Sequence, residues 1–307
     1  MTLVFILMGA VIWDLLLGEP SARLHPVVYM GKYISALWRY RPSGKEKALL
    51  VFGGALVLAG GYLFIIPARL LGIFPNFFYA ILAIPMLKTT FSLAGLLEAG
   101  EGVMVSLEGG DLQGAREKLS RDLVSRETED LSPSETAGAA IESLAENLTD
   151  SVASPLFFFG VLGLPGAFFY RFCNTCDSML GYREGDMEWG GKFAAKCDDV
   201  LNWVPARISA FFMLAAGALA GEDLLGGIEA LRRERVFTAS PNAGWTMAVM
   251  AGLLGVTLEK RDAYSLAGGD AAPDEESLRR AIKVVRFASA LTLVAAAILS
   301  GLHGLFR

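Results

Sequence analysis

"SVASPLFFFGVLGLPGAFFYRF", residues 151–172, shows most clearly what kind of fold this chain adopts. The stretch is apolar over most of its length, and about 20 residues of apolar helix are enough to cross the hydrocarbon core of a bilayer. It is interrupted by Gly163-Leu164-Pro165-Gly166, and proline removes a backbone donor and clashes with the preceding helical turn. The stretch therefore predicts a membrane-embedded helix with a break, either a simple span or a re-entrant hairpin.

The same apolar character extends along the rest of the chain. Of 307 residues, 53% are hydrophobic and 19% are charged, and the mean hydropathy is +0.46. A soluble domain is usually less apolar and more charged than this. The N-terminal apolar segment has no basic n-region and no small-residue cleavage site, so we expect it to stay as a membrane helix. The candidate membrane spans are residues 2–17, 48–72, 77–97, 152–172, 201–220 and 284–305.

We predict an all-α fold, a polytopic integral membrane helical bundle with broken or re-entrant helices and amphipathic cytoplasmic helices. Residues 1–307 form one integral membrane domain, and residues 98–150 and 221–283 are its polar connections on the cytoplasmic side. The positive-inside rule supports this orientation, because residues 18–47 carry six Lys/Arg and residues 221–283 carry eight. The net charge of −5 and the lack of a basic cluster argue against a nucleic-acid partner.

Two topologies remain open at this point. If residues 152–172 form a simple span, both basic connections are cytoplasmic, but residues 173–200 lie outside, away from residues 98–150. If residues 152–172 form a hairpin, residues 173–200 join residues 98–150 inside. One further segment must then break, for example 201–220 at Pro205, to keep the basic 221–283 connection in the cytoplasm.

The polar connections carry their own structural signals. Residues 98–150 predict amphipathic helices that are broken at Gly109-Gly110 and at "LSPSE", where Ser132 or Ser134 caps a new helix. The stretch "YSLAGGDAAPDEES", residues 264–277, is expected to be flexible.

An acidic stripe stands out in "AAIESLAENLTDSVASP", residues 139–155. Glu142, Glu146 and Asp150 are spaced four residues apart, so an α-helix places them on one face. Like charges at this spacing cost roughly 0.2–0.5 kcal/mol per pair, and a bound cation would remove that cost. The stripe is either a solvated helix face or one side of a cation site.

A second polar cluster follows the apolar stretch, in "YRFCNTCDSMLGYR", residues 170–183. It contains Asn174 and Asp177 and is either part of a site or an interfacial helix end with a capping aspartate. The spacing of Cys173 and Cys176 is that of a zinc or redox half-site. Because a zinc site needs four ligands and the chain has only two histidines, we interpret these cysteines as small thiols packed among helices.

A third polar cluster lies in "KCDDVLNWVPARISA", residues 196–210. Asp198 and Asn202 are four residues apart, and Asn202 and Arg207 enter an apolar helix. Polar groups at membrane depth are costly and are usually functional or paired. The alternative to a functional role is a simple Asp–Arg ion pair.

Two shorter motifs complete the set. His25 precedes a proline, which makes it either a ligand or a structural turn residue. The segment "FTASPNAGW", residues 237–245, has the turn chemistry of Ser-Pro-Asn-Ala-Gly directly before a helix, and a helix N-terminus behind such a turn favours anions. Carboxylates and carboxamides thus recur at the polar ends of the apolar segments, as a magnesium-dependent site for a phosphorylated substrate requires. The phosphate-loop, dinucleotide-binding and zinc-protease motifs are absent from the sequence.

The polar motifs, taken in order, resemble those of the CobD/CbiB family of cobalamin biosynthesis, the adenosylcobinamide-phosphate synthases. The resemblance extends from about residue 11 to about residue 270. It departs from the family pattern where Glu19 and Glu127 replace aspartates, and where the family commonly has apolar residues in place of the two cysteines. The segments that carry it are "DLLLGEPSARLHPVVYMGKYI", "SRETEDLS", "AAIESLAENLTDSVASPLF", "YRFCNTCDSMLGYR", "DDVLNWVPAR" and "SPNAGW".

The resemblance implies a reaction in which ATP, with Mg²⁺, drives amide formation between a propionate of adenosylcobyric acid and aminopropanol or aminopropanol phosphate. It implies a multi-pass protein of the cell membrane, with the lipid bilayer and other membrane-bound cobalamin-pathway enzymes as partners and the active site on the cytoplasmic side.

The residues and the resemblance together give a hypothesis for the site. The catalytic and metal-binding carboxylates would be Glu142, Glu146 and Asp150, with Asp177 and Asp198 as further metal ligands. The substrate-binding residues would be Asn147, Asn174 and Asn202 for carboxamides, Arg126, Arg207, Ser240 and Asn242 for phosphate, and His25.

Three other functions are compatible with parts of the sequence. Broken helices and Asp14 in an apolar segment would suit a transporter or channel, although no inverted repeat is visible. A non-enzymatic membrane sensor related to the family would be expected to have lost the polar motifs. A lipid diphosphate transferase would need D-D-x-x-D motifs, and Asp198-Asp199 is followed by Asn202 instead.

Overall fold

The structure is a computed structural model that describes residues 2–261 and 263–304. Residue 262, in the predicted 221–283 connection, and residue 305, the last of the sixth candidate span, lie outside the described residues. The chain divides into two compact units. The first comprises Met1–Ser92, Ser154–Asn202 and Ala295–Arg307, and the second comprises Leu93–Ala153 and Trp203–Val294.

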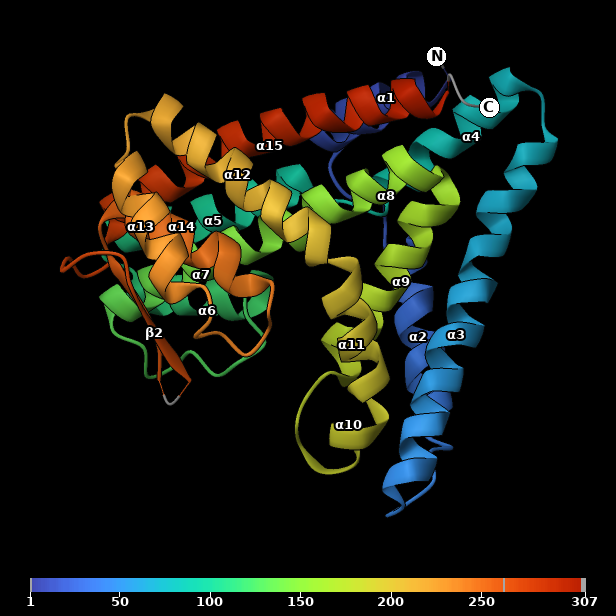
Figure 1. The fold of residues 1–307 in the computed structure, drawn as a ribbon, viewed down its shortest axis with the longest axis horizontal. Coiled ribbons are helices and arrows are strands. Elements are labelled where there is room, and N and C mark those ends of the chain that lie inside the picture. Colours follow the sequence, from blue (N-terminus) through green and yellow to red (C-terminus); the bar gives the residue numbers. More distant parts are fainter. Residues whose placement is uncertain (1, 262, 305–307) are drawn as a thin grey trace. The chain divides into compact units, whose positions relative to one another are not determined.

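The first unit is helical in its described residues and is built around α9 (Figure 1). Helices α2, α3, α8 and α11 all pack against α9. Aromatic rings join α9 to two of these helices. Phe172 of α9 stacks on Phe64 of α3 with ring centroids 5.2 Å apart, and it meets the edge of Tyr33 of α2 at a centroid distance of 5.9 Å. The helices of this unit are α1 (Thr2–Leu17), α2 (Pro26–Trp38), α3 (Glu46–Leu70), η1 (Leu71–Ile73), α4 (Asn76–Lys88), α8 (Ser154–Leu162), α9 (Leu164–Leu180), α10 (Gly185–Gly190) and α11 (Lys192–Leu201).

The break predicted between Gly163 and Gly166 is confirmed, because helix α8 ends at Leu162 and helix α9 begins at Leu164. Helix α8 has 9 residues, and at about 1.5 Å per residue it is too short to cross a hydrocarbon core of about 30 Å. Gly163 ends it with a φ of 71°, a conformation that residues with a side chain rarely adopt. Pro165 then lies in the first turn of α9, where its missing N–H costs nothing.

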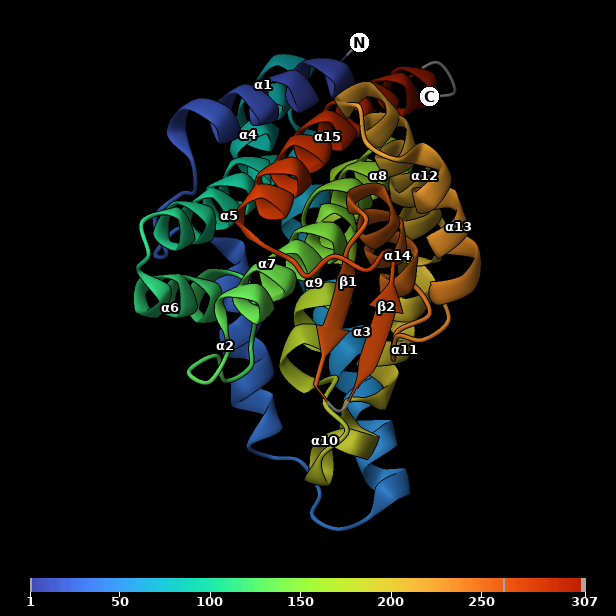
Figure 2. The same ribbon diagram turned by 90° about the vertical axis from the view of Figure 1, so that its left-hand side faces the viewer.

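The second unit has α7 and α14 at its centre, and most residues of these two helices are buried. Helix α14 packs against α7, α12 and α13, and α7 also packs against α5 and β1. Figure 2 shows the two strands lying beside these helices. The elements of this unit are α5 (Leu93–Glu108), α6 (Leu112–Asp122), α7 (Pro133–Asn147), η2 (Leu148–Ala153), α12 (Trp203–Ala220), α13 (Leu224–Glu234), α14 (Ala243–Leu254), β1 (Thr257–Lys260), β2 (Tyr264–Ala267) and most of α15 (Glu275–His303).

The prediction that residues 264–277 are flexible is wrong at their start, because Tyr264–Ala267 forms strand β2. It pairs antiparallel with β1, and Leu266 lies opposite Leu258. Both leucines are fully buried, so burial of apolar side chains holds the hairpin in place. The glycines of this stretch suggested flexibility, but they follow the strand rather than interrupt it.

The local helix signals of residues 98–150 are confirmed. Helix α5 ends before Gly109-Gly110, where Gly110 has a φ of 72°. Helix α7 begins after Ser132, whose hydroxyl accepts a hydrogen bond from the backbone N–H of Glu135. The Glu135 carboxylate in turn accepts one from the backbone N–H of Ser132. This reciprocal pair is a capping box, and it fixes the helix that carries the acidic residues.

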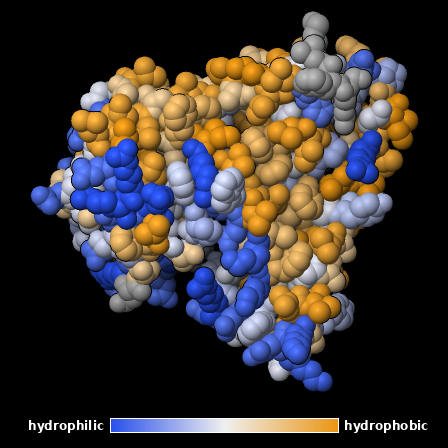
Figure 3. Space-filling model, viewed as in Figure 1, coloured by the Kyte–Doolittle hydropathy of each residue, from blue (hydrophilic) through white to orange (hydrophobic). Residues whose placement is uncertain are grey.

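Four helical stretches are long and apolar enough to cross a membrane. They are Glu46–Ile73 (α3 with η1), Asn76–Glu108 (α4 and α5), Trp203–Ala220 (α12) and Glu275–His303 (α15). They contain most of four of the candidate spans, and the all-α polytopic membrane fold is confirmed. The candidate span 2–17 is a shorter apolar helix. In the first unit, hydrophobic residues cover the surface around α8, whereas hydrophilic ones gather around α10 (Figure 3).

The candidate span 201–220 starts two residues later than predicted. Helix α11 ends at Leu201, Asn202 forms a turn, and α12 begins at Trp203. Pro205 lies in the first turn of α12 and does not break it, for the reason that applies to Pro165. The break considered for this segment at Pro205 is therefore wrong, because α12 runs unbroken from Trp203 to Ala220 and is long and apolar enough to cross a membrane.

Candidate functional site

The predicted acidic stripe lies where α7 gives way to a π-helical turn. Glu142 and Glu146 belong to α7, and Asp150 belongs to the π-helical turn η2. A π-turn has a little more than four residues per turn, so a spacing of four still places Asp150 close to the face of Glu146, although the regular α-helix ends at Asn147. Short π-turns inside helices are frequently found at functional sites.

Glu142 is a buried carboxyl with few partners. It is only 5% exposed, which contradicts the alternative of a solvated helix face at this residue. Its Oε2 lies 3.5 Å from Nη2 of Arg126, and its Oε1 has no hydrogen-bond partner among the described residues. Burial raises the pKa of Glu142 to about 7 against the opposing effects of Arg126, the Tyr264 hydroxyl and Lys260. The group is therefore poised to exchange a proton near neutral pH.

The segment that carries Arg126 is fixed to α7 by hydrogen bonds. The hydroxyl of Ser143 donates to the carbonyl oxygen of Leu123 over 2.6 Å. The side-chain amide of Asn147 donates to the carbonyl and hydroxyl oxygens of Ser143 at 2.9 and 3.0 Å. Arg126 therefore faces Glu142 from a segment tied to the same helix. Asn147, predicted to bind substrate, also helps to hold this arrangement.

The β-hairpin supplies two further groups to the surroundings of Glu142. Strand β1 packs against α7 and ends at Lys260, and β2 begins at Tyr264. Burial raises the pKa of the Tyr264 phenol, and the negative charges of Glu142 and Glu146 raise it further. Tyr264 is therefore a neutral hydrogen-bond donor beside two carboxylates.

A second cluster of the second unit surrounds Arg207. Its guanidinium carbon lies 4.1 Å from the ring centroid of Trp203 and 4.5 Å from that of Trp245. Its Nη1 lies 3.4 Å from Oδ1 of Asn242. The backbone N–H of Asn242 donates to the hydroxyl of Ser240 over 3.2 Å, which closes the predicted turn. Arg207, Ser240 and Asn242 therefore lie together, as the phosphate-site prediction requires.

A buried amide and carboxylate network lies in the first unit. Asp198 accepts hydrogen bonds from the side-chain amides of Asn174 at 3.2 Å and Asn202 at 2.8 Å. The Oδ1 atom of Asn202 accepts from the hydroxyls of Ser154 at 2.5 Å and Tyr170 at 3.0 Å. Burial raises the pKa of Asp198, although the two amides act against it. The alternative of a simple Asp198–Arg207 pair is wrong, because Asp198 binds asparagines instead.

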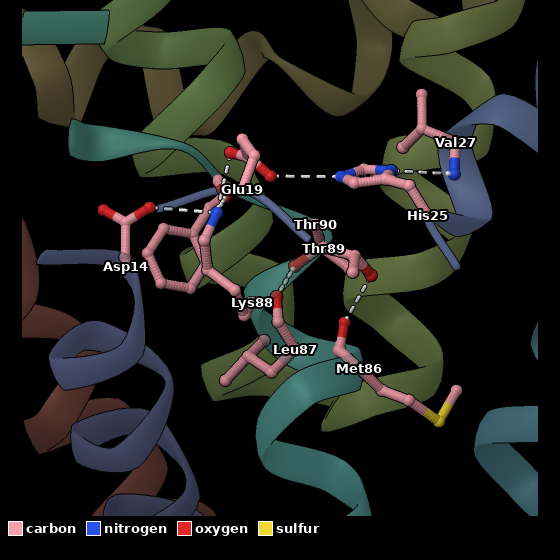
Figure 4. Close-up of polar contacts among 10 residues, drawn as sticks. Asp14, Glu19, His25, Val27, Met86, Leu87, Lys88, Thr89 and Thr90 are labelled. Atoms are coloured by element: carbon pink, nitrogen blue, oxygen red, sulfur yellow. Dashed lines mark hydrogen bonds and ion pairs between the residues drawn. The ribbon is translucent and has the colours of Figure 1, made fainter. Parts of the chain in front are cut away.

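His25 belongs to a chain of charged groups that Figure 4 shows around Lys88. Its Nε2 lies 3.1 Å from Oε2 of Glu19, and its Nδ1 accepts a hydrogen bond from the backbone N–H of Val27, so Nε2 carries the proton. Oε1 of Glu19 accepts a hydrogen bond from the Lys88 ammonium over 2.7 Å. Asp14 lies 2.9 Å from the same ammonium on its other side. Both nitrogens of His25 are engaged within the fold.

The cysteines and Asp177 complete the first unit's predicted residues. Cys173 and Cys176 are buried free thiols, and burial raises the pKa of both. Neutral buried thiols are unreactive, in keeping with a packing role. Asp177 is half-buried on α9 near the helix end.

The predicted site residues divide between the two units. The second unit contains Arg126, Glu142, Glu146, Asn147, Asp150, Arg207, Ser240 and Asn242. The first unit contains His25, Asn174, Asp177, Asp198 and Asn202.

Sequence reasoning missed several residues of these clusters. Of these residues, Lys88 could most readily have been predicted from the sequence, because an ionisable residue inside an apolar run usually has a role. Trp203 and Trp245 lie within motifs that were recognised but were not singled out. Tyr264 and Arg235 carry no local signal, since only the tertiary fold brings them to Glu142 and Trp245.

The predicted magnesium site needs oxygen ligands from the fold. Within residues 2–261 and 263–304, no group of three or more His, Cys, Asp or Glu is arranged to hold a metal ion. Mg²⁺ is usually bound by one or two carboxylates together with water and substrate phosphates. Glu146 and Asp150 are half-buried oxygen donors on consecutive turns, so they fit an ion shared with a phosphorylated substrate. Asp198 fits less well, because both of its oxygens already accept hydrogen bonds.

Comparison with known proteins identifies the family. The model of the family described as CobD/Cbib protein matches residues 7–294. A probable cobalamin biosynthesis protein CobD of Methanothermobacter thermautotrophicus is 41% identical over 96% of this chain and 95% of its own. A cobalamin biosynthesis protein CobD of Dehalococcoides mccartyi is 41% identical over 89% of both chains. A probable CobD of Pyrococcus abyssi is 38% identical over 92% of this chain and 91% of its own.

No solved structure matches the chain. The family match covers both units, including the segments that carry the Glu142, Arg207 and Asp198 clusters. The chain therefore belongs to the CobD/CbiB family of cobalamin biosynthesis proteins.

Proposed function

We propose that this protein is an adenosylcobinamide-phosphate synthase, an ATP-dependent ligase that joins aminopropanol phosphate, or aminopropanol, to a propionate of adenosylcobyric acid. Membership of the family supports a role in cobalamin biosynthesis and a corrinoid-related substrate. The observation that carries the ligase proposal is Glu142, a buried carboxyl with a pKa of about 7 beside a guanidinium and a phenol.

The first chemical step activates the propionate. An oxygen of a carboxylate is a poor leaving group, so the amine cannot displace it directly. In the proposed step a propionate oxygen attacks the γ-phosphorus of ATP, which gives an acyl phosphate and releases ADP. Arg126, which faces Glu142, is the residue that we assign to the transferred phosphoryl group, since a guanidinium binds phosphoryl oxygens in a bidentate manner. Arg207, Ser240 and Asn242 remain assigned to a substrate phosphate.

The second step forms the amide. The amine nitrogen attacks the acyl carbon, the carbon–oxygen bond to phosphate breaks, and phosphate leaves. The ammonium proton must be removed for this attack, and we assign its acceptance to the Glu142 carboxylate. A base with a pKa near the working pH is well suited to this transfer. Arg126 stabilises the ionised form of Glu142, and Tyr264 supplies a hydroxyl that remains protonated.

Magnesium is assigned to the same region. When bound, it would neutralise charge on the phosphoryl oxygens. Glu146 and Asp150 are the residues that would hold it, which leaves the more buried Glu142 for the proton.

The remaining assignments concern substrate binding. The edge of a corrinoid carries many carboxamides, and we assign Asn147 to them. The amides of Asn174 and Asn202 are buried and donate to Asp198 within the first unit, so we assign these two residues to holding Asp198. His25 is assigned to substrate binding on the family resemblance alone. We further propose that the site faces the cytoplasm at the cell membrane and that other membrane-bound enzymes of the pathway are partners.

An assay of the purified protein tests this function. The protein is incubated with adenosylcobyric acid, ATP with Mg²⁺, and either aminopropanol or aminopropanol phosphate, and the products are read by mass. The expected result is the amide, with one ADP and one phosphate released per amide, and none of it without ATP. Release of AMP would point to adenylate activation instead of an acyl phosphate. Absence of ATP-dependent amide with both amines would overturn the proposal.

A further inference from the structure

Two arginines of the second unit share one indole ring. Arg207 lies between Trp203 and Trp245, with its guanidinium carbon 4.1 and 4.5 Å from the two ring centroids. The guanidinium carbon of Arg235, which follows α13, lies 5.3 Å from the ring centroid of Trp245. Stacking on indole rings orients a planar guanidinium while leaving its N–H groups free to bind a ligand.

These two cations have no acidic partner of their own. In the part of the chain that the structure describes, neither guanidinium lies within ion-pair distance of a carboxylate. Arg235 donates to the carbonyl oxygens of Leu231 and Arg232, each at 3.1 Å, and Arg207 donates to the carbonyl oxygen of Trp203. Two like charges close to the same ring repel each other, and an anion bound by both guanidiniums would relieve that repulsion.

The surrounding backbone adds further attraction for an anion. Helix α14 starts beside the two arginines with the Ser240–Asn242 turn in front of it, and the N-terminal end of a helix carries partial positive charge. Its start lies so close to the end of α13 that a Cβ on Gly244 would be 2.2 Å from the carbonyl oxygen of Arg235. Glycine at this position is therefore what allows the helix end and Arg235 to meet.

We infer that Arg207 and Arg235 form a binding site for the phosphate group of a phosphorylated amine substrate. The site is built as phosphate recognition requires, with two guanidiniums fixed by indoles and a helix N-terminus. The anion site itself is argued from geometry alone, and its assignment to the amine rests on the proposed ligase function. Arg235 is new to the site, and it makes the site specific for the phosphorylated amine over the free amino alcohol.

A phospholipid headgroup carries the same chemistry and is the competing source of the phosphate. Trp203 is 54% exposed at the start of a candidate membrane span, a position typical of the bilayer surface. The experiment therefore has one arm for a soluble phosphate and one for a lipid.

The first arm measures binding of inorganic phosphate to the purified protein in phosphatidylcholine nanodiscs by calorimetry, with chloride as the reference anion. Arg207→Gln and Arg235→Gln are each expected to weaken phosphate binding about 10- to 100-fold. Arg232→Gln, a matched change of an exposed arginine on α13, should leave it unchanged. Arg207→Lys keeps the charge without the planar stack and serves as the variant least expected to disturb folding, which is checked by thermal unfolding.

The second arm counts phosphatidylglycerol molecules retained by the protein, using native mass spectrometry in mixed nanodiscs. Retention of phosphatidylglycerol that depends on both arginines, without binding of inorganic phosphate, would overturn the assignment to the amine. Equal phosphate binding by wild type, Arg207→Gln and Arg235→Gln would overturn the site altogether.

Turnover then separates this inference from the ligase proposal. Arg235→Gln should lower kcat/KM about 10- to 100-fold for aminopropanol phosphate but not for aminopropanol. Equal losses with both amines would contradict the specificity claim. A protein that binds phosphate through both arginines yet makes no amide would retain the anion site and refute the proposed function.

Discussion

Each unit contains a buried ionisable side chain, Lys88 in the first and Glu142 in the second. The two differ in how many polar partners surround them. The Lys88 ammonium is fully buried and is surrounded by Asp14 at 2.9 Å, Glu19 at 2.7 Å and the carbonyl oxygen of Phe91 at 3.1 Å. The Glu142 carboxyl is nearly as buried but faces one guanidinium at 3.5 Å and keeps an oxygen without a hydrogen bond.

The difference separates a structural charge from a chemical one. A buried charge with several close partners holds elements together, and its loss leaves those partners unpaired. A buried carboxyl with few partners stays costly to ionise, which is how a fold adjusts a carboxyl to exchange protons near neutral pH. We therefore expect substitutions at Lys88 to affect the fold first and substitutions at Glu142 to affect turnover first.

The largest expected effect is on turnover. Glu142→Gln keeps the size of the side chain and removes its ability to accept a proton, so kcat/KM for amide formation should fall about 10²- to 10⁴-fold. Glu259→Gln, the same change at an exposed position of β1, is the matched control and should leave turnover unchanged. Steady-state kinetics of ADP and amide formation measure both. Turnover of Glu142→Gln within a few-fold of wild type would make Glu142 a structural residue.

The next effect is on stability. Lys88→Met leaves Asp14 and Glu19 without their cation and should destabilise the first unit by about 3–5 kcal/mol. Thermal unfolding in detergent would measure this, with the exposed Lys47→Met as control. Adding Asp14→Asn to Lys88→Met should recover part of the loss, because it removes one of the two stranded charges. A Lys88→Met protein as stable as wild type would show that the network does not hold the unit together.

The third effect is the pH dependence that Glu142 gives to the stability of the protein. Its pKa rises from an ordinary value of 4.5 to about 7 on folding, so between these pH values the folded state binds more protons than the unfolded state. The free energy of unfolding therefore falls as pH rises from 4.5 to 7, and the full cost, on the order of 3 kcal/mol, persists above pH 7.

Glu142→Gln removes this cost. Relative to wild type, it should raise the unfolding temperature at pH 8 and leave it nearly unchanged at pH 4.5. Paired thermal melts at the two pH values measure this difference. If Glu142→Gln were equally destabilised at pH 4.5 and pH 8, Glu142 would stabilise the folded state instead of destabilising it at high pH.

The smallest expected effect concerns the helix that positions Glu142. Ser132→Ala removes the hydroxyl of the capping box and should cost about 1 kcal/mol of stability. Ser134→Ala, two residues on and outside the cap, is the matched control. Thermal unfolding measures the stability of both variants. If Ser132→Ala lost no more stability than Ser134→Ala, the capping box would not stabilise α7.

Short-range features were predictable from the sequence. The break at Gly163 and Pro165, the cap at Ser132 and four candidate spans follow from local chemistry, because glycine, proline and capping residues act within one helical turn. The closeness of Arg207 and the Ser240–Asn242 turn was also implied by their assignment to one ligand.

Features that depend on tertiary packing were not predictable. Whether Glu142 faces water or the interior depends on α14 and the β-hairpin, which follow it by about a hundred residues or more. The π-turn that contains Asp150 has no marker in the spacing of the acidic residues. Lys88 was visible as a lone cation in an apolar run, but its partner Glu19 lies 69 residues earlier in the chain, and Asp14 lies earlier still.

The pH dependence of kcat/KM for amide formation tests most directly whether Glu142 is the proton acceptor. Wild type should show a limb in which the rate rises with pH and has its midpoint near 7, the pKa of Glu142. In Glu142→Gln this limb should vanish, while the rise at higher pH caused by the amine substrate remains. If Glu142→Gln kept a limb near pH 7, another residue would be taking the proton and the assignment of Glu142 would be wrong.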